Sequence, residues 1–259
     1  MNRIAKAFLP LFLALPSLAW AQFSAQISPP RFEERAGAGT VYRDVVEIYN
    51  TSNQPLRLKV GTADWKLDAN GNAEFSKSLE EGSCRPWTAI ESQEIEVEPR
   101  AKRRFRFEVR VPTDAPDGQC RFALLFEGEP VRMPNMPMPV AGRIGVVVYL
   151  DIGNGAAQLV LESSGVHVDG ERRLPYLKVR NDGNAHGRLQ GFVDGRDAAG
   201  RKWTFAPAGH PLLPGASRDI TLFPVLAEGE TADLVFPVAI SGRTEWKGTP
   251  FAIDTQASE

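Results

Sequence analysis

The fold of this chain is decided by the stretch Gly118-Gln119-Cys120-Arg121-Phe122-Ala123-Leu124-Leu125-Phe126 and its companion Ile144-Gly145-Val146-Val147-Val148-Tyr149-Leu150. Each segment is short, rich in aliphatic, β-branched and aromatic residues, and bounded by glycine or other turn residues. That pattern predicts two mostly buried β-strands. Together with the loop between them, they organise residues 117–152.

The loop between these strands holds every methionine of the chain except Met1. An apolar residue then recurs at even positions, interrupted at Gly142, which places the side chains on one face of an extended segment: Met136, Met138, Val140, Ile144, Val146, Val148 and Leu150. Two interpretations stay open. One is a core hairpin with a loose connector, and the other is an edge strand whose exposed end adds to a partner's sheet. Unbranched methionine suits a surface that fits several partners.

The first residues predict export. Arg3 and Lys6 precede an apolar run from Ala7 to Leu18, and Ala19-Trp20-Ala21 has the small-x-small pattern of a cleavage site. We therefore expect residues 1–21 to be a cleaved secretory signal peptide. No later stretch is apolar for long enough to span a bilayer.

Two cysteines, Cys84 and Cys120, lie in this exported chain. A disulfide is the expected state of such a pair in an oxidising compartment. The pair has no CxxC spacing that would favour redox chemistry, so we predict a structural bridge.

The charge pattern indicates neither nucleic-acid binding nor a cofactor. The formal net charge is −2 and becomes −4 once the two basic residues of the signal peptide are removed. A basic cluster is interleaved with Glu94, Glu96, Glu98 and Glu108, which predicts cross-strand ion pairs on a solvated face. The cluster consists of Arg100, Lys102, Arg103, Arg104, Arg106 and Arg110. The histidines His167, His186 and His210 have no metal-ligand spacing, and His186 is expected at a surface turn. We expect no metal, no cofactor and no enzymatic activity, because no catalytic motif is present.

Turn residues recur at short intervals, with 23 glycines and 20 prolines, and no helical period follows the signal peptide. The two halves also resemble each other, since each has a strand that ends in asparagine, at Asn50 and at Asn181. About seven short strands per hundred residues is typical of an immunoglobulin-like sandwich. We predict an all-β chain of two tandem immunoglobulin-like β-sandwich domains, at residues 22–152 and 157–259.

The first half resembles the amino-terminal domain of periplasmic pilus chaperones of the PapD-like class. The resemblance covers about residues 24–152 and rests on the following segments: Ile27-Ser28-Pro29-Pro30-Arg31-Phe32-Glu33, Val46-Glu47-Ile48-Tyr49-Asn50, Glu98-Pro99, Val111-Pro112, Gly118-Gln119-Cys120-Arg121-Phe122 and Arg143-Ile144-Gly145-Val146-Val147-Val148-Tyr149. It implies a periplasmic location and donor-strand complementation, in which the chaperone supplies a strand that an unfinished subunit lacks. It implies an exported pilin-like subunit as client, and an outer-membrane assembly protein is a second candidate partner.

The resemblance also implies a carboxylate anchor between the domains. In the family two basic side chains hold the terminal carboxylate of the subunit. Arg31 matches the first of them, while Gly145 stands where the family has a lysine. Arg143, two residues earlier and on the same face, is the candidate substitute. The client-strand contacts would be Met136, Met138, Val140, Ile144, Val146 and Val148.

Three functions remain open from the sequence. The first is a chaperone for pilus-type or other exported β-rich subunits. The second is a structural or adhesion accessory protein of the same domains without chaperone activity. The third is an enzyme or a ligand-binding protein with a site between the domains.

Overall fold

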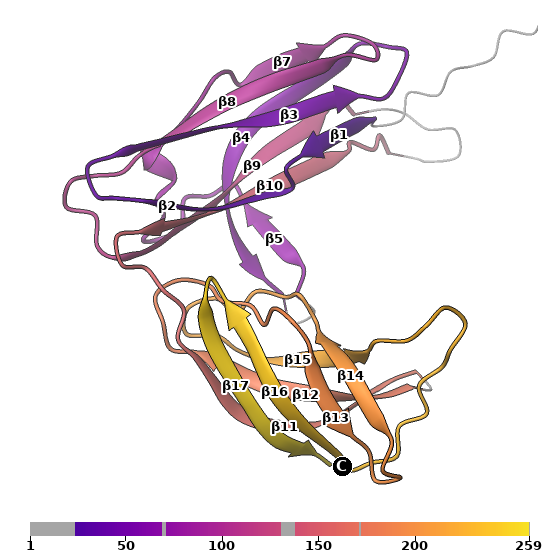
Figure 1. Cartoon of the computed structure of the whole chain (residues 1–259). Helices are drawn as coiled ribbons and strands as arrows, with labels where there is room; N and C mark the ends of the chain where they lie inside the picture. The colour runs from indigo at the N-terminus through magenta and orange to yellow at the C-terminus, as the bar shows by residue number, and fades with distance from the viewer. Residues whose placement is uncertain (1–23, 69–70, 131–137, 171, 259) are drawn as a thin grey trace, which may run out of the picture.

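The computed structural model describes residues 24–68, 71–130, 138–170 and 172–258. The regular elements of these residues are strands, apart from one 3-10 helix, η1 (Arg85–Trp87). The strands build two β-sandwiches that lie one above the other, and the hairpin of β4 and β5 reaches from the first toward the second (Figure 1). The fold is therefore all-β with two immunoglobulin-like sandwiches, as predicted. The predicted signal peptide, residues 1–21, lies outside the described residues.

The first sandwich consists of two sheets. One sheet has the order β1-β3-β8-β6, with strands β1 (Ala25–Ser28), β3 (Val41–Asn50), β8 (Lys102–Arg110) and β6 (Thr88–Ile90). The other has the order β2-β10-β9-β4-β5, with β7 also paired to β4. Its strands are β2 (Arg31–Ala36), β10 (Arg143–Ile152), β9 (Gly118–Gly128), β4 (Leu56–Leu67), β5 (Ala73–Ser76) and β7 (Glu94–Val97).

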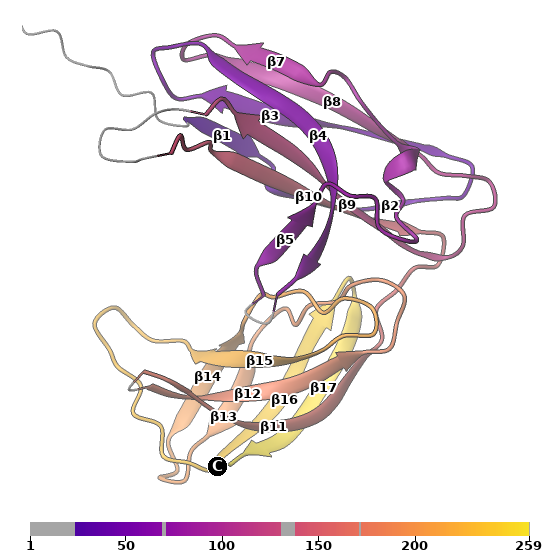
Figure 2. The ribbon, with the colours of Figure 1, turned by 180° about the vertical axis from the view of Figure 1, so that it is seen from behind.

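The second sandwich is one continuously hydrogen-bonded sheet of seven strands, folded over on itself, in the order β11-β12-β15-β14-β13-β16-β17. Its strands are β11 (Leu159–Asp169), β12 (Arg172–Asn181), β13 (Val193–Arg196), β14 (Lys202–Pro207), β15 (Ser217–Pro224), β16 (Val238–Trp246) and β17 (Thr249–Ala257). The two ends of this path meet, since the Ser164 hydroxyl on β11 lies 2.7 Å from the Thr255 hydroxyl on β17. Figure 2 shows the same arrangement from behind.

Alternating side chains make the cores. On β8, Phe105, Phe107 and Val109 are at most 3% exposed, whereas the residues between them carry charge. They pack with apolar residues of β3, β9 and β10 into one buried cluster. A separate cluster around Leu177, Phe205 and Ile240 fills the second sandwich. Each sandwich therefore has its own hydrophobic core.

Pro29-Pro30 divides the first extended segment of the described chain between the two sheets. Before it, β1 pairs antiparallel with β3, and after it, β2 pairs parallel with β10, with Arg31 opposite Val147. Proline has no N–H to donate to a sheet, so the chain can leave one sheet and enter the other at this point.

The predicted disulfide is present between Cys84 and Cys120, whose Cα atoms are 5.6 Å apart. The predicted repeat also has a structural basis. Asn50 and Asn181 end β3 and β12 respectively, and both are fully buried. Each accepts a hydrogen bond from the backbone N–H two residues later and donates to the carbonyl oxygen four residues later.

Two strands of the second half differ from the sequence prediction. The segment 188–194 has the sequence pattern of a strand, but the strand begins only at Val193, because Arg188 turns toward the first sandwich and Gly191 has a φ of 107°. The segment 232–240 also has the sequence pattern of a strand, but the strand begins at Val238, after Pro237, and continues to Trp246. The exact domain boundaries, 22–152 and 157–259, stay predictions.

Candidate functional site: a strand edge and the cleft between the sandwiches

The first half of β10 has one open side. Strand β9 pairs with β10 from Arg143 to Ile152, whereas β2 pairs with it only from Val147 onward. Among the residues that the structure describes, 143–146 therefore have a sheet neighbour on one side only. Such an edge presents backbone N–H and C=O groups to which another strand can add.

The residues just before this edge are apolar and exposed. Met138 is 73% exposed and Val140 is 43% exposed, while Ile144 is half-buried. Val146 and Val148, in contrast, are fully buried in the core of the first sandwich. The expectation that Val146 and Val148 contact a client is therefore corrected, because their side chains already fill their own core. Met136 lies outside the described residues.

The structure does not bring Arg31 and Arg143 together. The parallel register places Arg31 opposite Val147, four residues beyond Arg143, which corresponds to about 13 Å along the strand. Each already faces a carboxylate. Arg31 Nε lies 2.7 Å from Glu33 Oε1, and Arg143 Nη1 lies 3.7 Å from Glu127 Oε1. Their joint role as a carboxylate anchor stays a prediction.

Gly145, between these two arginines, has a packing role. A Cβ atom at this position would clash with the ring of Phe75, which belongs to β5. The guanidinium of Arg143 also lies 5.9 Å from the centre of that ring. The absence of a side chain at position 145 thus lets the β4–β5 hairpin close over β10.

A small apolar cluster joins the two sandwiches. On the sheet face opposite the main core, Trp65, Ala123 and Tyr149 are buried, and Leu213 of the second sandwich packs against them. The hairpin of β4 and β5, which carries Trp65, extends toward the second sandwich at this place (Figure 1). This sheet face of the first sandwich is thus partly covered by the second sandwich.

His186 lies at the centre of this junction. Its ring stacks on Tyr149 with centroids 3.8 Å apart, and Trp246 contacts it edge-on at 5.0 Å. Gln119 Nε2 lies 2.8 Å from His186 Nδ1. Since His186 is fully buried, the expectation of a surface turn was wrong. Burial lowers the pKa of His186, despite the opposing effect of nearby Glu33.

Charged side chains from both sandwiches surround this histidine. Glu33 Oε1 lies 3.3 Å from Arg188 Nη2 in addition to its contact with Arg31. Burial alone would raise the pKa of Glu33, but His186 and the two arginines lower it to about 2. Lys247 Nζ lies 2.5 Å from Asp151 Oδ2, and Gln119 donates to the other carboxylate oxygen. Sequence reasoning missed this network because its members lie far apart along the chain.

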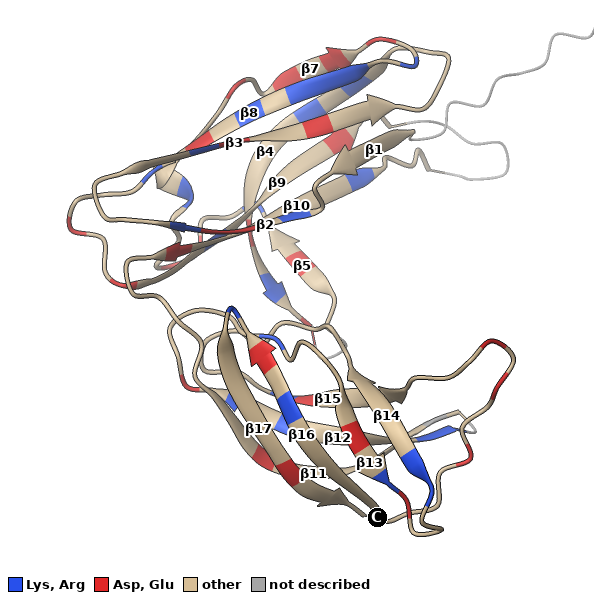
Figure 3. Cartoon of the chain, viewed as in Figure 1, with Lys and Arg blue, Asp and Glu red and all other residues tan. Residues whose placement is uncertain are grey.

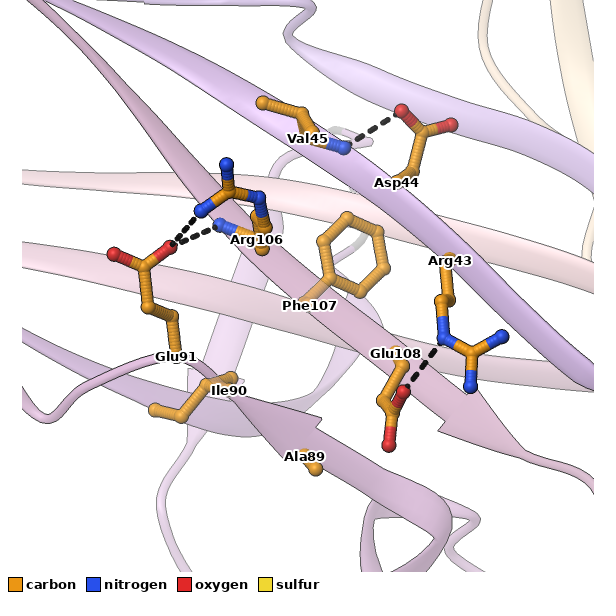
Figure 4. Close-up of a pocket in the computed structure, with 9 residues that line it drawn as sticks. All are labelled: Arg43, Asp44, Val45, Ala89, Ile90, Glu91, Arg106, Phe107 and Glu108. Atoms are coloured by element: carbon orange, nitrogen blue, oxygen red, sulfur yellow. Dashed lines mark hydrogen bonds and ion pairs between the residues drawn. The ribbon is translucent and has the colours of Figure 1, made fainter.

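Most basic residues of β8 face a glutamate, as predicted: Lys102, Arg103, Arg106 and Arg110 each have one within 4 Å. Figure 3 shows blue and red segments side by side on β3, β7 and β8. Arg43 lies 2.9 Å from Glu108, and Arg106 lies 3.7 Å from Glu91. These pairs border a shallow, mostly apolar hollow over Phe107 (Figure 4). Exposed pairs of this kind each contribute little to stability.

Within the described residues, no group of three or more His, Cys, Asp and Glu side chains is arranged to hold a metal ion, and no helix is long and apolar enough to cross a membrane.

Solved structures similar to this chain are largely pilus chaperones. The class 5 fimbriae chaperone CfaA is 11% identical, with 90% of this chain and 99% of that chain covered and a TM-score of 0.47. A complex of the SafA pilin with the SafB chaperone from Salmonella enterica is 15% identical, covers 91% and 98%, and has a TM-score of 0.47. A CsuC–CsuE complex of a chaperone and a tip subunit from Acinetobacter baumannii is 13% identical, covers 91% and 99%, and also has a TM-score of 0.47.

No protein-family model matches the chain, and no curated protein matches it either. At 11–15% identity, residue roles do not transfer from the solved structures to this chain. The functional argument therefore depends on the geometry of the chain itself.

Proposed function

We propose that this protein is a periplasmic chaperone that binds an exported β-rich subunit, of the pilin type, by adding a strand to it. The observation that carries the proposal is the open side of β10 at Arg143–Val146, directly after the exposed Met138 and Val140. An extended segment with a free edge and alternating apolar side chains can complete a sheet that lacks a strand. An outer-membrane assembly protein is the second partner that this function entails.

The proposed contact set is smaller than the sequence indicated. Met138, Val140 and half-buried Ile144 lie at or beside the open edge, so they can enter a groove of the client without unfolding the first sandwich. Main-chain hydrogen bonds along residues 143–146 would give affinity, and these side chains would give specificity.

The structural or adhesive alternative keeps one observation in its favour. Val146 and Val148 are fully buried within their own sandwich, as expected for a strand that is paired internally. In that case the open edge of β10 would have no ligand, and Met138 would be an incidental exposed side chain.

A charge placed at Met138 separates the two functions. Met138→Asp should abolish co-purification of a stoichiometric β-rich subunit from the native periplasm, because an aspartate cannot enter an apolar groove without a large desolvation cost. Val168→Asp in the second sandwich is the matched control, since Val168 is 74% exposed and Met138 is 73% exposed. Melting temperatures close to that of the wild type would show that both variants are folded. Unchanged capture by Met138→Asp would remove the proposed edge from the mechanism.

A further inference from the structure

His186 is buried by the contact between the two sandwiches. It belongs to the second sandwich, but its ring stacks on Tyr149 of β10 in the first, and Trp246 of β16 contacts it edge-on. The chain passes from one sandwich to the other through residues 153–158, between the end of β10 and the start of β11. The environment of this ring therefore depends on how the two sandwiches meet, and not on either hydrophobic core alone.

The Gln119 side chain fixes which ring nitrogen of His186 carries the proton. The amide oxygen of Gln119 accepts a hydrogen bond from the His186 backbone N–H at 3.2 Å, and its Nε2 donates to Asp151 Oδ1 at 2.6 Å. This orientation directs the other N–H of the amide at His186 Nδ1, which is 2.8 Å from Nε2 of Gln119. Because Nδ1 has to accept this hydrogen bond, the neutral ring carries its proton on Nε2.

A protonated ring would have no acceptor for either of its N–H groups in this junction. A proton on Nδ1 would face the N–H of Gln119, so that two donors would meet. Nε2 is buried without a hydrogen bond, and Glu33 Oε1 at 3.7 Å is too distant to accept one. Burying a cation whose donors are unsatisfied is costly, whereas water can satisfy both donors once the two sandwiches separate.

The charged groups around the ring oppose one another. The titratable and charged side chains that face it are Glu33 of β2, Tyr149 and Asp151 of β10, Arg188, and Lys247 between β16 and β17. Glu33 favours a protonated ring, but its carboxylate also faces two arginines. Asp151 is paired with Lys247, and Tyr149 is neutral because burial raises its pKa to about 12. Burial lowers the pKa of His186, and the two nearby cations act in the same direction.

We propose that the junction is a pH-sensitive switch, in which protonation of His186 separates the two sandwiches at residues 153–158 while each sandwich stays folded. The closed junction accepts only the neutral ring, so each opening takes up one proton. The ratio of open to closed molecules should therefore rise about tenfold for each unit by which the pH falls below about 6.5. Each sandwich can stay folded because the two main cores have no residue in common. The switch does not involve the edge of β10, so it stands or fails separately from the chaperone function.

Spin labels measure the opening directly. Nitroxide labels on Arg104→Cys of β8 and Lys202→Cys of β14 report the distance between the sandwiches, because both positions are exposed and lie outside the junction. The labelled chain should show one distance distribution at neutral pH and a second one whose share grows between about pH 6.5 and 5. His186→Gln in the same labelled chain should keep the neutral distribution throughout. His167→Gln is the matched control and should open normally, since the side chain of His167 on β11 is 40% exposed.

Amide hydrogen exchange distinguishes opening from unfolding. At the pH where half of the molecules are open, the amides of β8 and β12 should stay protected, because each strand belongs to the core of its own sandwich. Loss of protection in either sandwich at that pH would overturn the proposal. A distance distribution that does not change with pH, or that changes equally in His186→Gln, would also overturn it.

A measurement on the unlabelled side chains of the wild type tests the chemistry of the ring itself. In a chain with ¹⁵N-histidine, the ring resonances of His186 are assigned by their absence in His186→Gln. At neutral pH they should show the tautomer with the proton on Nε2, and they should change to those of an imidazolium over the pH range in which the sandwiches separate. A proton on Nδ1 at neutral pH, or an imidazolium at a pH where the spin labels show only the closed distance, would contradict the switch.

Discussion

In the second sandwich the two end strands β11 and β17 lie against each other, whereas in the first sandwich β10 keeps an open side along Arg143–Val146. Ser164 of β11 contacts the Thr255 hydroxyl and donates to the Gln256 carbonyl of β17, so the end strands of that sheet cover each other. Strand β2 could have covered β10 in the same way, but it begins to pair only at Val147. The two sandwiches share one fold and differ in whether an edge is available.

This difference shows where a partner can bind. Side-chain hydrogen bonds hold the ends β11 and β17 of the second sandwich next to each other, which makes their edges less accessible to an added strand. An open edge next to exposed apolar side chains has the opposite property. The first sandwich is therefore the candidate for strand addition, and the second sandwich supplies His186, Arg188 and Lys247 to the junction.

The largest expected effect comes from removing the disulfide, which only the first sandwich has. The double variant Cys84→Ala with Cys120→Ala opens a loop of 36 residues, and loop-closure entropy predicts a loss of about 4 kcal/mol. Hydrogen exchange read segment by segment should show the loss on β3, β8 and β9 and little change on β12 and β16. An equal loss in both sandwiches would mean that they unfold as one unit.

A smaller effect is expected from the asparagines that the two sandwiches have in common. Asn50→Ala leaves the carbonyl oxygens of Gln54, Val97 and Glu98 without their side-chain donor, and the expected loss is about 3 kcal/mol in the first sandwich. Asn181→Ala should do the same to the second sandwich, where the side chain donates to the Ala185 and Leu212 carbonyls. Denaturant unfolding measures both losses.

Gln54→Ala is the control for these asparagines, because Gln54 contributes only backbone atoms, its carbonyl oxygen and its N–H, to that network. A loss in Gln54→Ala as large as that in Asn50→Ala would contradict the role given to the buried amide.

The smallest effect concerns the junction that links the open and the closed sandwich. Burial lowers the pKa of His186 on folding, so the unfolded chain binds the proton more readily. The burial of neutral His186 therefore stabilises the folded state fully above about pH 6.5, and this stabilisation is lost as the pH falls below that value. Glu33, whose pKa falls from 4.5 to about 2, acts in the same direction at still lower pH.

His186→Gln should make the melting temperature less dependent on pH just below 6.5. The charged groups that face His186 are Glu33, Arg188 and Lys247, and they are unchanged in this variant. A pH dependence identical to that of the wild type would show that His186 does not titrate on unfolding.

Local patterns predicted the fold well. Residues close together in the sequence predicted the alternation on β8, the apolar runs of β9 and β10 and the paired asparagines. The disulfide could be predicted because an exported chain with two cysteines has one possible pairing. The junction could not be predicted in this way. His186 is polar and follows a turn, so only the stacking of Tyr149 and Trp246 from distant strands explains its burial. The same limit applies to Val146 and Val148, whose period of two is equally compatible with an exposed edge and a core.

Because β2 pairs with β10 only from Val147 onward, the length of a strand that can add to the first sandwich is limited. Such a strand can pair with the open side of β10 from Arg143 to Val146, but no further, since Arg31 of β2 lies opposite Val147. Four residues at about 3.3 Å each give a docking length of about 13 Å. A partner strand that is too long would have to bend away at Arg31, and a shorter one would leave part of the edge open, so the length of the groove itself selects among partners.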